Sequence, residues 1–169
     1  MGARYEDVVS IGPGTLAGRF LRCFWQPIAL AQSLKPKRPM PIRILGEDFT
    51  LYRGESGKAH LVAPQCPHRG LSLSVGRVMG DQIECFYHGW TFATDGKCTA
   101  QPAEDARFKE GVCIATYPVH ETLGLIFAYL GAGDPPEFPV LDVFQQGRIE
   151  NRASYRPWPF FAQIENSVD

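Results

Sequence analysis

The chain has 169 residues, of which 44% are hydrophobic and 21% are charged, and its net charge is −1. Such a chain can bury a hydrophobic core, and this composition excludes a largely disordered protein. The balanced charge excludes a basic surface of the kind that binds nucleic acid. No apolar run approaches the ~20 residues of a membrane-spanning helix, because the longest one, Leu123–Leu130, has only the length of a strand.

The cysteines and the N-terminal residues indicate the cellular compartment. Five cysteines are scattered along the chain, a pattern that is not typical of a disulfide framework. Residues 1–7 include acidic side chains and no apolar segment, so we expect no secretory signal. We therefore expect a cytoplasmic protein whose thiols are reduced or bound to metal.

The first predicted element is a helix. Apolar side chains recur every four residues from Leu16 to Phe24, which predicts a short helix within Thr15–Trp25. Cys23 lies on this apolar stripe, so we expect it in the core. Residues 35–39, a basic segment with two prolines, then lead into the main domain.

Short apolar segments alternate with turn residues from Pro41 to Leu130, in a chain with 17 glycines and 14 prolines. This pattern is typical of an antiparallel all-β domain without long helices. The turns are expected at Gly46–Asp48, Gly54–Gly57, Gly80–Asp81 and Asp95–Gly96. The last two strands are expected at Val112–Thr116 and Leu123–Leu130, with a break at Pro118 between them.

The composition changes after the β-domain. Residues 131–139 are rich in glycine and proline and are expected to form a linker, and residues 151–155 are a candidate strand. Phe160–Asp169 has apolar residues at helical spacing and no cap at its end, so we expect a helix that continues in a longer polypeptide. The predicted domains are an N-terminal segment (1–38), a β-domain (39–138) and the start of a further domain (139–169).

Two short clusters of cysteine and histidine carry the chemistry. Cys66 and His68 are separated by one residue, and Cys85 and His88 follow further along the chain. Thiolate and imidazole are the ligands of zinc and of iron–sulfur sites. A Cys-x-His pair in an extended segment places both side chains on one face, where a loop can offer sulfur to one metal and nitrogen to a second. A zinc finger needs a different spacing, with histidines on a helix.

The segments Cys66-Pro-His-Arg-Gly and Cys85-Phe-Tyr-His-Gly-Trp resemble the Rieske [2Fe–2S] signature, Cys-x-His followed by Cys-x2-His. The resemblance implies that Cys66 and Cys85 bind one iron and that His68 and His88 bind the other. A structural zinc module is the alternative, in which one zinc and no sulfide would be bound.

The two segments also indicate a subfamily. Neither contains a second cysteine, unlike the Rieske proteins of respiratory complexes, so they resemble those of ring-hydroxylating oxygenases and Rieske-type ferredoxins. Tyr87 and Trp90 are similar to residues of the oxygenase loop. The alternative for these two aromatic residues is that they pack the loop against the sheet.

Asn166 and Asp169, three residues apart on the predicted helix, resemble the start of the mononuclear-iron motif of the oxygenases, Asn-x2-Asp-x2-His-x3–4-His. By this resemblance, Asp169 is an electron-transfer bridge that links His88 of one subunit to the mononuclear iron of the next, and Asn166 lies near that iron. The histidine ligands would lie beyond residue 169. The alternative is that both residues are ordinary polar residues at a helix end.

The whole chain thus resembles the N-terminal part of the large (alpha) subunit of a Rieske non-haem iron oxygenase of the phthalate-dioxygenase-like branch. The resemblance implies an antiparallel β-sandwich Rieske domain, a short N-terminal helix and the start of an α+β (helix-grip) catalytic domain. It also implies a [2Fe–2S] cluster and, beyond residue 169, a mononuclear Fe(II). Electrons would come from NAD(P)H through a reductase, with or without a ferredoxin.

The same resemblance implies O2-dependent hydroxylation of an aromatic or similarly apolar substrate by a homo-oligomer, a trimer in this branch. The alternative is a stand-alone Rieske-type electron-transfer protein. Outside the motif, we expect Cys98 and Cys113 to behave as small hydrophobic residues. His60 and His120 are expected to be surface or hydrogen-bonded structural histidines.

Overall fold

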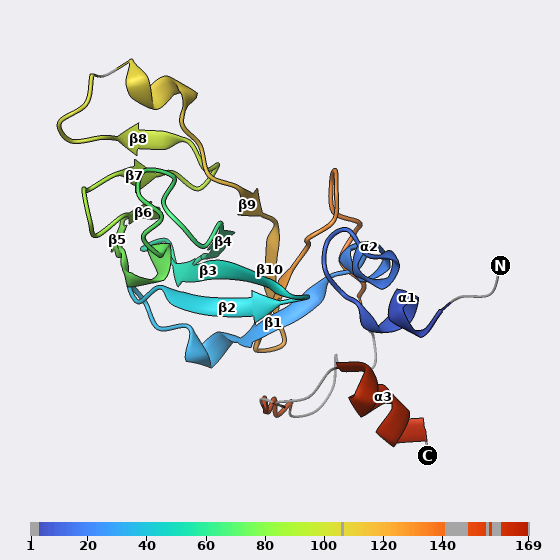
Figure 1. The fold of residues 1–169 in the computed structure, drawn as a ribbon. Helices are drawn as coiled ribbons and strands as arrows, with labels where there is room; N and C mark the ends of the chain where they lie inside the picture. The colour runs from blue at the N-terminus through green and yellow to red at the C-terminus, as the bar shows by residue number, and fades with distance from the viewer. Residues whose placement is uncertain (1–3, 106, 141–148, 155, 157–159, 169) are drawn as a thin grey trace.

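Two short helices, α1 (Tyr5–Val9) and α2 (Leu16–Arg22), precede the β-domain (Figure 1). The computed structural model of the protein describes residues 4–105, 107–140, 149–154, 156 and 160–168. The side chain of Thr15 caps α2, because its oxygen accepts a hydrogen bond of 3.1 Å from the Gly18 N–H. The predicted helix is therefore confirmed in a shorter form.

Over the described residues the strands form three antiparallel sheets. The first sheet has the order β1 (Gln26–Leu30), β11 (Leu125–Ala128), β10 (Val119–Thr122). The second has the order β2 (Met40–Ile44), β3 (Glu47–Arg53), β4 (Ala59–Val62), β9 (Thr116–Tyr117). The third has the order β5 (Arg77–Met79), β6 (Gln82–Glu84), β7 (Thr91–Phe92), β8 (Cys98–Ala100). The predicted mainly-β, antiparallel fold is confirmed.

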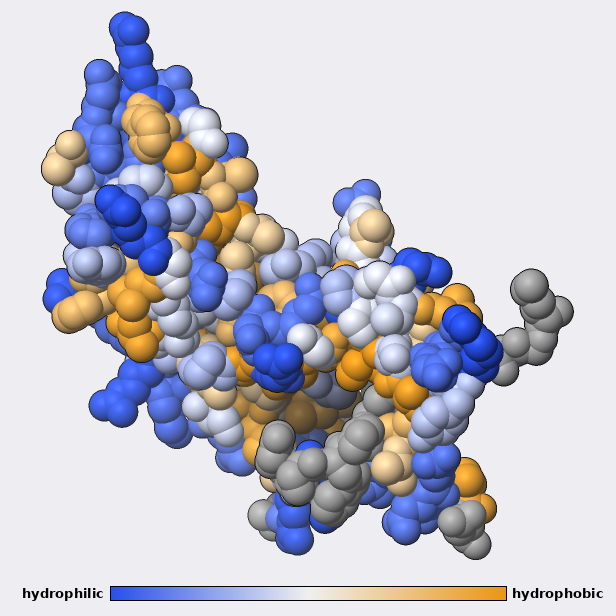
Figure 2. Space-filling view, viewed as in Figure 1, coloured by the Kyte–Doolittle hydropathy of each residue, from blue (hydrophilic) through white to orange (hydrophobic). Residues whose placement is uncertain are grey.

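The remaining described elements are short. Three single-turn helices lie between strands, namely η1 (Ala31–Ser33), η2 (Leu73–Val75) and η3 (Phe108–Gly111). Helix α3 (Phe160–Val168) confirms the predicted C-terminal helix, and Asp169 lies outside the described residues. Among the described residues, no helix has the length and apolar character needed to cross a membrane. Figure 2 shows that apolar residues reach the surface in scattered patches between polar ones.

Strand β3 contributes to two cores, because the second sheet lies between the other two. Leu51 packs in one core with Ile126 of β11, whereas the neighbouring Tyr52 packs in another core with Phe92 of β7. Alternate side chains of a strand point to opposite faces, so β3 is buried on both sides. The core beside the third sheet also contains the cysteines of both candidate metal-binding segments. This core therefore positions the candidate site.

Tight turns with positive φ join the hairpins where glycine allows them. Leu45 and Gly46, with φ of 49° and 82°, form the two-residue turn between β2 and β3. The turn predicted at Gly46–Asp48 therefore begins one residue earlier, and its last two residues belong to β3. The other predicted turns are confirmed, at Gly54–Gly57, Gly80–Asp81 and Asp95–Gly96.

The two edges of the β-domain differ from the prediction. Leu123 and Gly124, with φ of 52° and 76°, form a turn, so the strand expected from Leu123 begins at Leu125 and follows the unpredicted strand β10. The strand expected at 112–116 is reduced to a bridge at Cys113 and the start of β9. Strand β1 is also unpredicted, because Pro27 marks a break in the sequence but occupies an irregular register position against β11.

The apolar stripe of α2 does not face the core, so the prediction for Cys23 is wrong. Phe20 is 63% exposed and Cys23 is also exposed, whereas Gly18 and Arg22 are buried. Gly18 lies so close to the preceding loop that a Cβ atom there would come within 1.9 Å of the Gly12 carbonyl oxygen. The face with Gly18 and Arg22 therefore points inward, because it packs closely against this loop, and this close packing outweighs the more apolar character of the opposite face.

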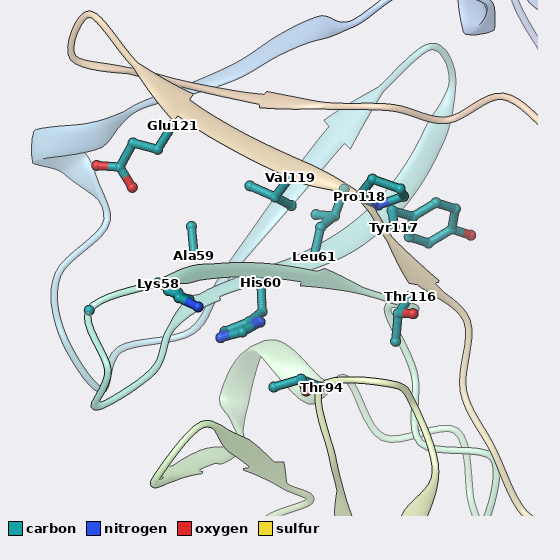
Figure 3. Close-up of a pocket in the computed structure, with 11 residues that line it drawn as sticks. Lys58, Ala59, His60, Leu61, Thr94, Thr116, Tyr117, Pro118, Val119 and Glu121 are labelled. Carbon is teal, nitrogen blue, oxygen red and sulfur yellow. The ribbon is translucent and has the colours of Figure 1, made fainter. Parts of the chain in front are cut away.

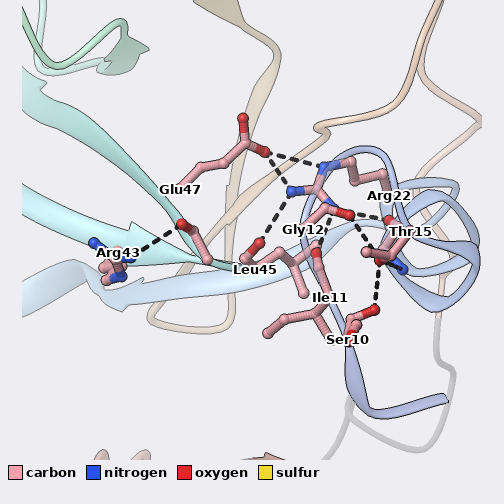
Figure 4. A network of polar contacts seen from close by, with 10 residues as sticks. Ser10, Ile11, Gly12, Thr15, Arg22, Arg43, Leu45 and Glu47 are labelled. Atoms are coloured by element: carbon pink, nitrogen blue, oxygen red, sulfur yellow. Dashed lines mark hydrogen bonds and ion pairs between the residues drawn. The ribbon is translucent and has the colours of Figure 1, made fainter. Parts of the chain in front are cut away.

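The buried guanidinium of Arg22 joins the N-terminal segment to the β2–β3 turn (Figure 4). It donates hydrogen bonds to the carbonyl oxygens of Ile11, Gly18 and Leu45 at 2.8, 2.9 and 3.1 Å, respectively. It also forms an ion pair with the carboxylate of Glu47. A buried arginine requires such partners, so this network fixes the position of α2 against the second sheet.

The segment predicted as a linker packs against the first sheet. The Trp25 Nε1–H donates a hydrogen bond of 2.9 Å to the Pro136 carbonyl oxygen. The ring of Phe138 stacks on that of His120, with 4.2 Å between the centroids, and lies edge-on to Phe127 of β11. Residues 151–154 have no regular structure, and residue 155, the last residue of the candidate strand, lies outside the described residues.

Candidate metal centre

The first candidate loop runs from Cys66 to Leu71, between β4 and η2. The Cys66 N–H donates a hydrogen bond of 2.9 Å to the Leu71 carbonyl oxygen, and the Gly70 N–H donates one of 2.9 Å back to the Cys66 carbonyl oxygen. Gly70 has a φ of +72°, a conformation that glycine adopts without a steric penalty. These two hydrogen bonds close the loop and place its cysteine at the base and its histidine at the tip.

The second candidate loop, from Cys85 to Trp90, connects β6 to β7 and repeats this geometry. The Cys85 N–H donates a hydrogen bond of 2.8 Å to the Trp90 carbonyl oxygen. The Gly89 N–H donates a hydrogen bond of 3.0 Å to the Cys85 carbonyl oxygen, and the φ of Gly89 is +71°. The two loops differ in where they carry histidine, at the second residue after the cysteine in one and at the third in the other.

The two thiols adjoin each other inside the core. Cys66 and Cys85 are 2% and 3% exposed and belong to the same core, and Cys85 is close enough to act on the pKa of the Cys66 thiol. Burial, and then the neighbouring Cys85, raises the pKa of the Cys66 thiol to about 11. A thiolate is the form that binds metal, so the positive charge of a bound metal would offset the cost of deprotonating these buried groups.

The two imidazoles adjoin each other nearer the surface. The ring centroids of His68 and His88 are 4.6 Å apart, and His88 is the more exposed of the two. Each ring also stacks on an aromatic side chain of the second loop. The His68 ring lies 4.5 Å from the Trp90 ring with an interplanar angle of 5°, and the His88 ring lies 3.8 Å from the Tyr87 ring.

The structure thus brings the four predicted ligands together as two pairs, with sulfur inside and nitrogen outside. Within the part of the chain that the structure describes, no group of three or more His, Cys, Asp or Glu side chains is arranged around a single point. What the structure does show is one pair of neighbouring thiols and one pair of neighbouring imidazoles. Two donors for each of two adjacent metal ions fit this arrangement, and the donor types are those of iron–sulfur and zinc chemistry.

A further segment covers the second loop. A Cβ atom on Gly89 would come within 3.1 Å of Pro102 Cγ, so the Pro102 ring lies directly on this loop. The ring of Phe108 meets that of Trp90 edge-on at 6.2 Å. The sequence does not indicate that Pro102 and Phe108 cover the loop, because they lie in a different segment from the motif. Trp90 is indicated by the sequence, because it ends the Cys-x2-His-Gly-Trp segment.

Asn166 lies far from these loops in the chain fold. It is an exposed residue of α3, which packs against α1 through the rings of Tyr5 and Phe161, 5.8 Å apart. In Figure 1, α3 lies far from the ends of β4 and β6, the strands that lead into the two candidate loops. The structure therefore does not bring Asn166 to the candidate ligands of its own chain, and Asp169 lies outside the described residues.

A groove of about 670 Å³ opens elsewhere, where β4 and β10 diverge (Figure 3). His60, Thr94 and Glu121 are among its lining residues, and none of the four candidate ligands lines it. The His60 ring stacks on Tyr52, and its Nε2 is buried without a hydrogen-bond partner, so the expected hydrogen bond is absent at this atom. Burial lowers the pKa of His60.

The other residues outside the motif divide by burial. Cys98 is buried in the same core as the candidate cysteine ligands, which fits the small hydrophobic residue expected there, whereas Cys113, for which the same was expected, is exposed. His120 is an exposed residue, as predicted, and its ring stacks on Phe138. All five cysteines belong to the described residues, and none of them forms a disulfide.

Comparison with known proteins relates the chain to one family of metal-binding domains and to subunits of oxygenases. The sequence profile of the Rieske [2Fe-2S] domain matches residues 24–118. The chain is 37% identical to the 5,5'-dehydrodivanillate O-demethylase oxygenase subunit of Sphingobium sp., over 97% of this chain and 40% of that protein. It is 41% identical to the phenoxybenzoate dioxygenase subunit alpha of Ectopseudomonas oleovorans, over 83% of this chain and 36% of that protein. The chain thus spans well under half of these relatives.

Solved structures agree with the sequence comparison. The terminal oxygenase of carbazole 1,9a-dioxygenase from Novosphingobium sp. KA1 matches with a TM-score of 0.59 and 32% identity, over 69% of this chain and 32% of that one. A reduced complex between oxygenase and ferredoxin in carbazole 1,9a-dioxygenase matches with a TM-score of 0.57 and 31% identity, over 68% of this chain and 30% of that one.

Proposed function

The chain belongs to the Rieske [2Fe-2S] domain family, and we propose that it is the cluster-bearing part of the oxygenase component of a Rieske non-haem iron oxygenase. One observation carries the proposal, namely two adjoining buried thiols beside two adjoining imidazoles on a pair of matching loops. The names of the relatives, oxygenase subunits of a demethylase and of a dioxygenase, support the enzyme class.

We assign Cys66 and Cys85 to one iron of a [2Fe–2S] cluster, and His68 and His88 to the other. The donor set fits, because a Rieske cluster replaces two cysteines by two histidines on one of its irons. When bound, the cluster would accept and release one electron at a time. The buried cysteines would hold the inner iron away from water, and the histidines would hold the outer iron at the surface. His88 is the more exposed ligand, so we place electron exchange on its side.

We further propose the source and the destination of the electrons. They would come from NAD(P)H through a separate reductase, and the similarity to an oxygenase–ferredoxin complex supports a ferredoxin as the intermediate carrier. A mononuclear Fe(II), bound by residues beyond Asp169, would use them for O2-dependent hydroxylation of an aromatic or similarly apolar substrate. The absence of disulfides among the five cysteines supports a cytoplasmic location.

The separation of α3 from the candidate ligands favours electron transfer between subunits. Helix α3, which includes Asn166, lies far in space from β4 and β6, which lead into the two loops, so an iron near α3 would be served by the cluster of another copy. We propose a head-to-tail homotrimer, because a heterologous interface that closes on itself forms a ring. In it, Asp169 would accept a hydrogen bond from the His88 ring of one subunit and orient a histidine ligand of the next, with Asn166 near that iron.

Metal analysis of the purified protein tests the cluster assignment. We expect two cluster irons and two acid-labile sulfides per chain, and loss of both when Cys66, Cys85, His68 or His88 is replaced by alanine. Cys98→Ala and His120→Ala are the matched controls, because they remove a buried thiol of the same core and an exposed imidazole, and both should retain the cluster. One zinc without sulfide would replace the proposal with a structural zinc module.

A second measurement separates the oxygenase from a stand-alone carrier. The oxygenase should bind additional iron and couple reductase-driven NAD(P)H oxidation to the hydroxylation of an aromatic substrate. A protein that cycles its cluster with the reductase but binds no additional iron would be an electron carrier. Because the two measurements are independent, the cluster assignment can succeed when the oxygenase assignment fails.

A further inference from the structure

The histidines of the two matching loops have different surroundings. In each loop the residue five positions after the cysteine accepts the hydrogen bond of the cysteine N–H, and this residue is Leu71 in one loop and Trp90 in the other. Trp90 reaches across to the first loop, where its ring lies 4.5 Å from that of His68 at an interplanar angle of 5°. A parallel arrangement at this distance is a stacking contact between planar rings.

Trp90 is itself held on several sides. It is 5% exposed and packs in the core of the third sheet. Its carbonyl oxygen accepts the hydrogen bond from the Cys85 N–H at 2.8 Å, and its ring meets the edge of Phe108. A side chain fixed by both its backbone and its core contacts offers a rigid surface to whatever lies on it.

We propose that Trp90 is a positioning residue that holds the His68 imidazole in one orientation and keeps water from one of its faces. The inference rests on the proposed assignment of His68 as an iron ligand. It adds an asymmetry between the two histidines, because the surface behind His88 is the ring of Tyr87, which is 61% exposed. Trp90 therefore makes His68 the anchored ligand, and His88 is the ligand open to other proteins.

The contact has a consequence for the redox potential. Two ferric ions, two sulfides and two thiolates give a neutral oxidised cluster, so the reduced cluster has one negative charge. Water stabilises that charge, and the apolar surroundings of a metal site limit access of water. Removing the indole ring would admit water to His68, which would favour the reduced form. The expected result is a higher reduction potential.

Two substitutions in the cluster-loaded protein separate stacking from volume. Trp90→Leu fills part of the space without a flat ring, whereas Trp90→Phe keeps a flat ring of smaller area. We expect Trp90→Leu to raise the reduction potential, to change the electron paramagnetic resonance spectrum of the reduced cluster, and to release iron to a chelator about 10-fold faster. Trp90→Phe should change all three in the same direction and by less than half as much.

Phe92→Leu is the matched control. Phe92 is an equally buried aromatic residue of the same core, and no ring contact joins it to either histidine among the described residues. This variant should lose thermal stability while it keeps the wild-type potential and resonance spectrum. If Trp90→Leu does not hold a cluster, Trp90→Met takes its place, because its unbranched side chain has a similar volume and fills irregular gaps without a ring.

The positioning role fails if Trp90→Leu or Trp90→Met keeps the wild-type potential and spectrum, if Trp90→Phe shifts them as much, or if Phe92→Leu shifts them equally. The underlying ligand assignment fails in a different way. In that case His68→Ala retains the cluster and its spectrum, or the wild-type protein contains no [2Fe–2S] cluster at all. The two failures are therefore distinguishable.

Discussion

Gly70 and Gly89 adopt the same left-handed conformation, four residues after the cysteines of their loops, but only Gly89 is covered by another segment. An alanine Cβ at Gly70 would meet no atom within 4 Å, whereas at Gly89 it would lie 3.1 Å from Pro102 Cγ. A substitution at Gly70 therefore measures the destabilisation caused by a positive φ alone, whereas one at Gly89 adds the destabilisation caused by a steric contact.

We expect Gly70→Ala to lower the free energy of unfolding by about 1–2 kcal/mol, because a left-handed conformation is unfavourable for a residue with a Cβ atom. Gly89→Ala should cost more and should weaken retention of the cluster, since the Pro102 ring must also move. Urea unfolding and iron content measure the two effects. In the background of Pro102→Ala the two glycine substitutions should become equally costly, and a persistent difference would contradict this explanation.

A second prediction concerns the buried arginine of α2. Arg22→Leu should lower the free energy of unfolding by about 3–5 kcal/mol, because it leaves three carbonyl oxygens and the Glu47 carboxylate without their buried partner. Arg43→Leu is the control, because the ion pair of Arg43 with Asp48 is exposed to solvent and should contribute less than about 1 kcal/mol. Similar losses in both variants would show that the network does not stabilise the fold.

A third prediction concerns the dependence of stability on pH. Burial lowers the pKa of His60 below that of the unfolded chain, so the unfolded state binds a proton more readily. The contribution of neutral His60 is therefore complete above the unfolded pKa of about 6.5 and is lost as the pH falls through that value towards the folded pKa. His60→Phe keeps a ring beside Tyr52 and removes the titration, so its unfolding midpoint should vary less between pH 5 and pH 7, about the interval in which histidine titrates.

Denaturant midpoints at several pH values give the result, and an unchanged slope in His60→Phe would place the pH dependence in another group.

A fourth prediction concerns the proposed bridge between subunits. Asp169→Asn should leave the iron and sulfide content unchanged and lower the rate of product formation by about 10–100-fold, because it removes the charge that orients the two histidines. Glu165→Gln neutralises an exposed carboxylate of the same helix and should keep the wild-type rate. Normal turnover with Asp169→Asn would remove the bridging role but would not affect the cluster assignment.

Local patterns in the sequence determine much of this fold. The turns at Gly80–Asp81 and Asp95–Gly96 follow from the conformations that glycine allows, and the C-terminal helix follows from the spacing of its apolar residues. The Cys-x-His and Cys-x2-His segments indicate their chemistry in the same way, because spacing within a loop is a property of a few consecutive residues. Each loop closes through hydrogen bonds within six residues, so its shape depends little on the rest of the chain.

Tertiary structure alone decided which surfaces meet. Periodicity predicts an inward apolar stripe on α2, but Gly18 and Arg22 face inward, because the loop before the helix and the β2–β3 turn fit that face. The contact between His68 and Trp90 joins two loops, and the two residues are 22 positions apart in the sequence. Such contacts depend on how separate strands bring their loops together, and residue type at a single position does not encode that packing.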